Sequence, residues 1–128
     1  MAAAAEAVAR ARALVGVRFR PQGRSGAAGL DCVGLAAAAL GVEAPRADYR
    51  LRGGSAAELE AGLQRAGLRP APGPRPGDLL MMRSGPQQLH LGVWTGDGIV
   101  HADAGLRRVV ERPGPPPWPV LGCWRRED

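Results

Sequence analysis

The stretch GLDCVGLAAAAL, residues 29–40, places a cysteine at the start of an alanine-rich segment, directly after an aspartate. Asp31 is a residue type that caps helix N-termini, and Gly41 is a typical C-terminal stop, so we predict a helix over residues 31–40. In the first turn of a helix the backbone N–H groups and the dipole favour a thiolate. Cys32 is therefore a candidate nucleophile, although a lone cysteine is also commonly a small buried apolar residue.

Two more helices are expected in the first half of the chain. Residues 2–15 are alanine-rich and end at Gly16, and Ser55 with Glu58 forms a capping box that opens a helix to about Arg65. The segment between the first two helices, residues 16–30, is glycine-rich and is predicted to be a shaped loop.

The second half of the chain has the residue pattern of short β-strands. Prolines at alternate positions over residues 70–76 are expected to forbid regular structure there, and β-leaning segments separated by turn residues follow. The tail over residues 117–125 is predicted to be an edge strand, because prolines are tolerated there. Helices followed by antiparallel strands predict a single α+β domain over residues 1–128, with the helices packed on one face of a small antiparallel sheet.

The chain's two histidines lie on neighbouring predicted strands, residues 89–95 and 98–103, joined by a GDG turn. This turn predicts His90 opposite about residue 104 and His101 opposite about residue 93, offset along adjacent strands. Residue alternation places His90 on one face with Gly92 and Trp94, and His101 on one face with Ile99 and Asp103. The two rings come within contact distance if these faces coincide.

Cys32, His90 and His101 together have the residue types of a cysteine hydrolase. A nucleophilic thiol needs a base, and the base needs an orienting partner; His90 is the candidate base, paired with the thiolate as an imidazolium, and His101 the orienter. Histidines in strands are also commonly structural. Zinc is disfavoured because Cys32, His90, His101 and Cys123 include no closely spaced ligand pair, whereas a Cys32–Cys123 disulfide stays open. We expect Cys123 to be a packing residue beside Trp118 and Trp124.

Composition and charge limit the classes of molecule that the chain is expected to bind. The chain has 128 residues and a net charge of +5, and all 17 basic residues are arginine. The arginines are dispersed, with few aromatic residues between them to stack on bases, so a nucleic-acid-binding domain is a distant alternative. A positive field still favours an anionic substrate or surface, such as a cell-wall polymer.

No segment approaches the ~20 apolar residues of a membrane span. The N-terminal segment lacks the basic region and unbroken apolar core of a signal peptide, because Glu6, Arg10 and Arg12 interrupt it. We therefore expect the chain to be made in the cytoplasm.

Three motifs in order resemble those of the NlpC/P60 cysteine peptidases. GLDCVGL (29–35) is similar to the family's GxDCSGL, RPGDLLMM (75–82) to PGDLvff, and HLGVWTGDGIVHA (90–102) to HVGIYlGxGxmIHA. The first helix and the tail VLGCWRR (120–126) also resemble the phage-tail and gene-transfer-agent branch of that family. The resemblance thus extends over nearly the whole chain.

The resemblance implies a papain-like α+β fold and hydrolysis of peptidoglycan stem peptides between γ-D-glutamate and diaminopimelate, with no metal and no cofactor. By motif position Cys32 would be the nucleophile, His90 the general base and His101 the third polar residue. Backbone N–H groups near residues 31–32 would hold the oxyanion, and Asp31 would act as a cap rather than a catalyst.

The chain departs from the family pattern at two places. The segment RFRPQGR (18–24) puts Phe19 where the family often has a tyrosine, leaving Gln22 as the side chain that could assist the oxyanion. Val33 replaces the serine after the cysteine, which is common in the phage branch.

Two other functions stay open. One is a non-catalytic tail-assembly or wall-binding module of the same fold, and the other is an amidase or acyltransferase acting on another amide. The substrate lies outside the cytoplasmic membrane, so the favoured route is transport in a phage tail or phage-like particle, or release by a lysis system.

Overall fold

The computed structural model describes residues 2–21, 23–25, 29–43 and 55–126. Its helices are α1 (Ala2–Ala13), α2 (Cys32–Leu40) and α3 (Ala56–Arg65). Its strands are β1 (Arg24–Ser25), β2 (Gly29–Leu30), β3 (Leu68–Ala71), β4 (Leu79–Gly85), β5 (Gln88–Trp94), β6 (Gly98–Asp103), β7 (Arg108–Pro113) and β8 (Val120–Arg126). The three predicted helices are all present, and the predicted α+β class is confirmed.

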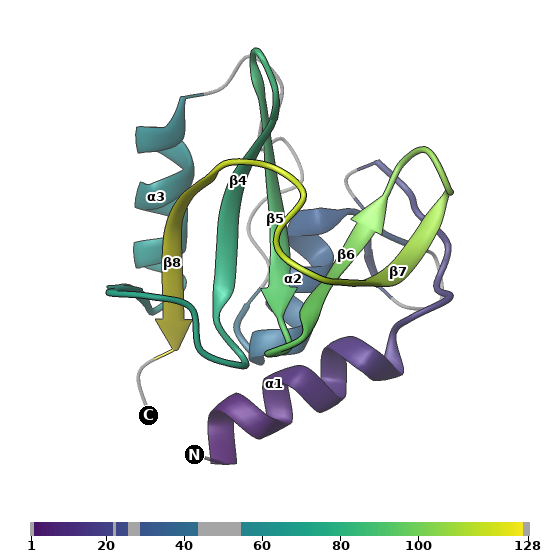
Figure 1. Cartoon of the computed structure of the whole chain (residues 1–128), viewed down its shortest axis with the longest axis horizontal. Helices are drawn as coiled ribbons and strands as arrows, with labels where there is room; N and C mark the ends of the chain where they lie inside the picture. Colours follow the sequence, from purple (N-terminus) through teal and green to yellow (C-terminus); the bar gives the residue numbers. More distant parts are fainter. Residues whose placement is uncertain (1, 22, 26–28, 44–54, 127–128) are drawn as a thin grey trace.

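The architecture is a six-stranded antiparallel sheet with helices packed against it (Figure 1). The strand order is β3-β8-β4-β5-β6-β7. Helix α2 packs on β5 and β6, α1 packs on α2, and α3 packs on β3. Alanines at the α1–α2 contact, including the buried Ala7, Ala11 and Ala39, let the two helices approach closely. The main apolar core therefore lies between the helices and the sheet.

Local sequence explains both ends of α2. The Asp31 carboxylate accepts a hydrogen bond from the Gly34 N–H at 2.9 Å, which satisfies one of the N–H groups that a helix start leaves without a partner. Gly41 ends the helix in the left-handed conformation, with φ of 67°. The predicted capping box also forms, because the Ser55 hydroxyl accepts from the Glu58 N–H at 3.0 Å.

Gly34 is a position where a side chain has no room. A Cβ there would overlap the Gly23 carbonyl oxygen, so α2 lies directly against the backbone of the preceding loop. Gly34→Ala is therefore expected to destabilise the fold by about 1–3 kcal/mol, although alanine is the better helix former. Chemical denaturation measures this. Gly73→Ala is the matched control, since a Cβ at Gly73 meets open space; a Gly34→Ala protein as stable as that control would contradict the packing described.

The β5–β6 register differs by one residue from the prediction. Val93 pairs with Val100 and Trp94 with Ile99, so His101 lies one position away from the expected partner. A one-residue shift in the register of an antiparallel pair moves the side chains of one strand to the opposite face relative to those of its partner. The observed register puts Trp94 and Ile99 on one face, and with them His90 and His101. The ladder has these two pairs only, and beyond them the strands diverge with α2 behind (Figure 1).

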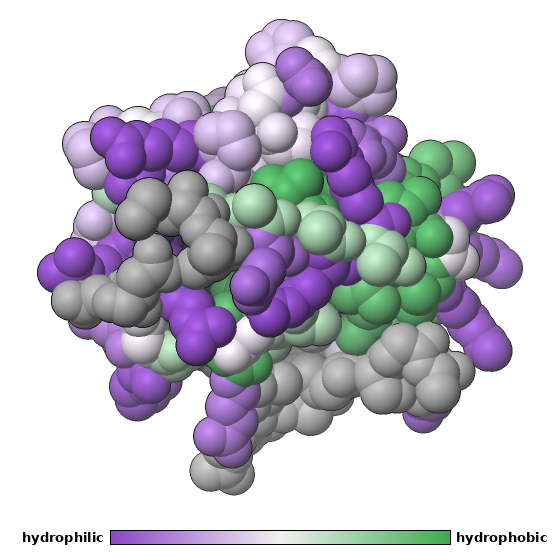
Figure 2. All heavy atoms as spheres, turned by 90° about the horizontal axis from the view of Figure 1, so that it is seen from below, coloured by the Kyte–Doolittle hydropathy of each residue, from purple (hydrophilic) through white to green (hydrophobic). Residues whose placement is uncertain are grey.

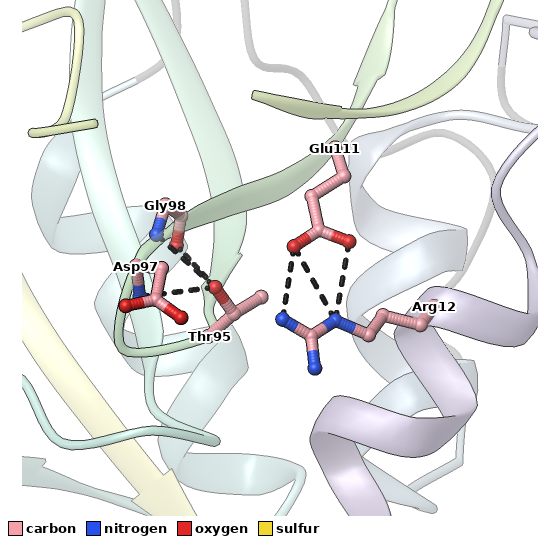
Figure 3. Close-up of polar contacts among 5 residues, drawn as sticks. All are labelled: Arg12, Thr95, Asp97, Gly98 and Glu111. Carbon is pink, nitrogen blue, oxygen red and sulfur yellow. Dashed lines mark hydrogen bonds and ion pairs between the residues drawn. The ribbon is translucent and has the colours of Figure 1, made fainter. Parts of the chain in front are cut away.

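Thr95 fixes this register. Its backbone N–H donates to the Gly98 carbonyl at 2.9 Å, and its hydroxyl accepts from the Gly98 N–H at 3.1 Å and the Asp97 N–H at 3.3 Å (Figure 3). The turn therefore closes between Thr95 and Gly98, one residue earlier than the GDG motif suggests. This closure explains why the predicted register was wrong.

Two predictions about the second half are wrong. Strand β8 is not at an edge, because it lies between β3 and β4. The segment that was expected to be irregular contributes β3, in which Pro70 is paired with Trp124. Strand β3 is itself an edge strand, and an edge tolerates a residue that lacks an N–H. The loop before α2 is also more ordered than expected, because β1 pairs with β2 and Phe19 forms a parallel bridge with Leu30.

An ion pair with a buried carboxylate connects β8 to the residue before β4. Asp78 is 1% exposed and receives two hydrogen bonds from the Arg125 guanidinium, at 2.7 and 2.8 Å. This two-point geometry suits arginine and a carboxylate particularly well. It ties the residue before β4 to the neighbouring strand β8.

The outer surface is mixed in character. Helix α1 runs below the sheet, and its Arg12 is ion-paired at 3.0 Å with Glu111 of β7 (Figures 1 and 3). From below, hydrophilic side chains are interspersed with apolar ones that gather toward one half of the view (Figure 2). Among the described helices none has the length and apolar character needed to cross a membrane.

Candidate active site

A cleft of about 560 Å³ brings the candidate catalytic residues together. It lies where β5 and β6 diverge next to the start of α2. Its lining includes Cys32, His90 and His101, and the remaining lining residues are Phe19, Pro21, Asp31, Ser84, Gln88, Ala102, Asp103, Ala104, Gly105 and Trp118. Residues separated by up to 99 positions in the chain, from Phe19 to Trp118, therefore share one cavity.

Cys32 is the first residue of α2, as the sequence predicts. It is 3% exposed and belongs to the main core, yet it also forms part of the cleft wall. It is not sealed in the core. Cys32 and Cys123 are both thiols rather than a disulfide, and Cys123 packs with Leu80, Met82 and Ile99 in a separate apolar cluster. The open question of a disulfide is thus answered, and Cys123 is a packing residue.

His90 and His101 are in direct contact. The His90 Nε2 and His101 Nδ1 atoms are 2.9 Å apart, which is hydrogen-bond distance. The ring centroids are 5.1 Å apart and the ring planes are nearly perpendicular, at 87°. One nitrogen of His90 is thereby committed to His101, and the ring of His90 is held in one orientation. This is the arrangement that a base with an orienting partner requires.

The surroundings of the pair favour neutral imidazoles. Burial, with a smaller contribution from His101, lowers the pKa of His90 to about 4, and Asp103 opposes the shift. Burial also lowers the pKa of His101, with Asp103 raising and Arg112 lowering it. A neutral imidazole is the form that accepts a proton. The lowered pKa therefore leaves His90 in the proton-accepting form. The pairing of His90 with a Cys32 thiolate stays a prediction.

Comparison with solved structures identifies this architecture. The chain superposes on NlpC2 of Trichomonas vaginalis with a TM-score of 0.71 and 19% identity, covering 97% of this chain and 46% of that one. For the P60 domain of Mycobacterium avium subspecies paratuberculosis antigen MAP1204 the TM-score is 0.64 with 22% identity. This match covers 98% of this chain and 94% of the P60 domain. The chain has the NlpC/P60 fold. The resemblance seen in the motifs is confirmed at this level.

A third NlpC/P60 structure, RipB of Mycobacterium tuberculosis, matches with a TM-score of 0.60 and 23% identity, covering 98% of this chain and 64% of RipB. The chain thus spans less than two thirds of NlpC2 and of RipB. No protein-family model and no curated protein matches the sequence. The NlpC/P60 likeness is therefore one of structure and short motifs.

The three residues predicted near the oxyanion lie in different places. Phe19 and Asp31 line the cleft. The Asp31 N–H donates to the Gly23 carbonyl at 3.3 Å. The oxyanion role of the N–H groups near residues 31–32 stays a prediction. The Asp31 carboxylate is a cap, as predicted. Gln22 lies outside the described residues.

Trp118 is a cleft residue that sequence analysis did not assign to the site. It lies in the turn before β8, and its ring centroid is 5.2 Å from that of His90 and 5.6 Å from that of His101. Both contacts are edge-to-face, with interplanar angles of 78° and 84°. The only available sign was a single aromatic residue within the proline run GPPPWP, residues 114–119.

The histidines and cysteines do not gather into a metal site in the part of the chain that the structure describes. No group of three His, Cys, Asp or Glu side chains there has the arrangement of a metal site. In the cleft, His90 and His101 instead contact each other.

Proposed function

We propose that the chain is a peptidoglycan hydrolase of the cysteine-peptidase type. The observation that carries the proposal is the His90–His101 contact in the same cleft as Cys32 at the start of α2. The proteins SagA and RipB, which share the fold, are named peptidoglycan hydrolases. The site supplies a nucleophile, a base and an orienting group, which acyl transfer through a thioester requires.

The proposed mechanism has two stages. The Cys32 Sγ attacks the carbonyl carbon of the substrate amide while His90 takes the thiol proton, and the N-terminal turn of α2 stabilises the negative oxygen. His90 then gives its proton to the leaving nitrogen as the C–N bond breaks, which leaves a thioester and a free amine. Water, deprotonated by His90, attacks the thioester and releases the acid and the thiol. His101 holds the His90 ring throughout.

The bond that we propose for cleavage joins the γ-carboxyl of D-glutamate to diaminopimelate. Its support is the resemblance of the motifs around Cys32, His90 and His101. The test is digestion of purified peptidoglycan and of synthetic stem peptides, with product masses and the newly formed amino group determined. The expected products are a peptide ending in D-glutamate and a fragment beginning with diaminopimelate.

Other products would separate the alternatives. Cleavage at another amide or transfer to an amine acceptor, instead of hydrolysis of this bond, would indicate an amidase or acyltransferase. A protein that binds peptidoglycan without releasing any fragment would be a wall-binding or tail-assembly module. Either result would contradict the proposed endopeptidase.

We also propose that the protein reaches the cell wall within a phage tail or phage-like particle. The support is the resemblance of the tail VLGCWRR and of Val33 to the phage branch. Mass spectrometry of purified particles is the test, and detection at a constant ratio to tail proteins is the expected result. Recovery only outside particles would contradict this route.

A further inference from the structure

One ring nitrogen of the histidine pair has no hydrogen-bond partner. Among buried side-chain nitrogens and oxygens of the described residues, His101 Nε2 alone lacks one. The residue is 1% exposed, so bulk water does not reach this atom. Buried polar groups are nearly always satisfied, and an exception requires an explanation.

The role of His90 as base determines which atom of His101 carries a proton. For His90 Nδ1 to accept a proton, the neutral His90 ring must carry its hydrogen on Nε2. That N–H then donates across the 2.9 Å contact, and His101 Nδ1 must be the acceptor. A neutral His101 with a bare Nδ1 has its hydrogen on Nε2, the atom without a partner. The opposite tautomers would block the base.

The indole of Trp118 contacts the ring that bears this hydrogen. Its ring contacts His101 edge-to-face, at 5.6 Å between centroids and 84° between planes. An aromatic face carries partial negative charge and accepts an N–H hydrogen weakly. We propose that Trp118 is a positioning residue, whose indole face accepts the His101 Nε2–H and thereby sets the tautomers that leave His90 Nδ1 free to act as the base.

This inference rests on the proposed function only in naming His90 as the base. Trp118 would act through His101 and His90 rather than on the substrate bond. The same contact covers both histidines with an apolar ring, because Trp118 is also edge-to-face with His90 at 5.2 Å. Losing the indole would therefore change the histidine pair even without a substrate.

The decisive experiment is NMR of the full chain with ¹⁵N-labelled histidine near pH 7. We expect His101 to carry its proton on Nε2, with Nδ1 bare, and the Nε2 proton to be shifted upfield by the indole ring current. This measurement uses the wild-type protein, so it does not depend on a variant that folds. A His101 protonated on Nδ1, or an Nε2 proton shifted downfield as in an ordinary hydrogen bond, would overturn the proposal.

Variants give the functional readout. Trp118→Leu is expected to raise the population of His101 protonated on Nδ1. It should slow alkylation of Cys32 by iodoacetamide about 10- to 100-fold, less than complete loss of a general base, because only part of the population has the base blocked. Trp118→Phe keeps an aromatic face and should retain most of both properties. Peptide mass spectrometry distinguishes Cys32 from Cys123.

Trp94→Leu is the matched control. Trp94 and Trp118 both pack against the apolar cluster of Leu80, Met82 and Ile99. The Trp94→Leu substitution should leave the histidine tautomers and the alkylation rate unchanged. Equal effects of Trp94→Leu and Trp118→Leu, or unchanged tautomers in Trp118→Leu, would overturn the proposal. Neither readout uses peptidoglycan, so a failure of the proposed hydrolase activity would be seen separately, in the digestion experiment.

Discussion

Replacing Cys32 with alanine is expected to lower the rate of muropeptide release by about 10³-fold or more, because the thiol is the proposed nucleophile. The fold should survive, since the side chains differ by one sulfur atom. The cost in the free energy of unfolding should stay within about 2 kcal/mol. Product release is measured by mass spectrometry, and folding by circular dichroism and thermal unfolding of the same samples.

Cys123→Ala is the matched control for this change. It also removes a thiol, but from the apolar cluster on Leu80, Met82 and Ile99. Its activity should stay near that of the wild type. If Cys32→Ala still releases the same fragments, the cysteine mechanism is wrong. If Cys123→Ala lowers activity as much, the loss reflects packing rather than chemistry.

The second large effect concerns pH. The folded pKa of His90 is about 4, below its ordinary value of 6.5, because burial disfavours the charged ring. Between these values the unfolded chain binds a proton that the folded chain does not, so the free energy of unfolding falls as pH falls from 6.5 to 4. The difference between the two pKa values corresponds to a loss of about 3 kcal/mol in the free energy of unfolding. Above pH 6.5 the His90 ring contributes no pH dependence to this free energy.

His90→Gln isolates this contribution. The difference in unfolding free energy between wild type and variant should be constant above pH 6.5. As the pH falls from 6.5 to 4, the wild type should lose stability relative to the variant. Peptidoglycan release by His90→Gln should drop about 10²- to 10⁴-fold, as for loss of a general base. In the wild type the acid limb of kcat/KM should lie near pH 4. A limb near 6.5, or an unchanged stability difference, would show that the ring is readily protonated in the folded protein.

The parts of the fold that sequence predicts are those governed by local chemistry. Asp31 and Gly41 mark the ends of α2, and Ser55 with Glu58 opens α3, because each cap acts within a few residues. The two histidines could be assigned to neighbouring strands for the same reason. Their common face could not, because it depends on where Thr95 closes the turn.

Long-range pairing is what sequence did not reveal. Strand β8 inserts between β3 and β4, and neither neighbour adjoins it in the chain. Proline content predicted an edge position for the tail and no strand around Pro70, whereas the prolines before Val120 lie outside β8 and Pro70 occupies the edge strand. Trp118 was missed for a related reason, because only the return of the chain into the centre of the sheet brings its ring over the histidines.

The central position of β8 also has a consequence for the order in which the chain folds. The strands β4 to β7 pair with sequence neighbours and close short loops, which form quickly. Among the described strands β3 pairs with β8 alone, so it contacts α3 but joins the sheet only when residues 120–126 have been made and have docked. The two histidines therefore assemble early, while two of the six strands and the Trp118 ring above the histidines arrive last.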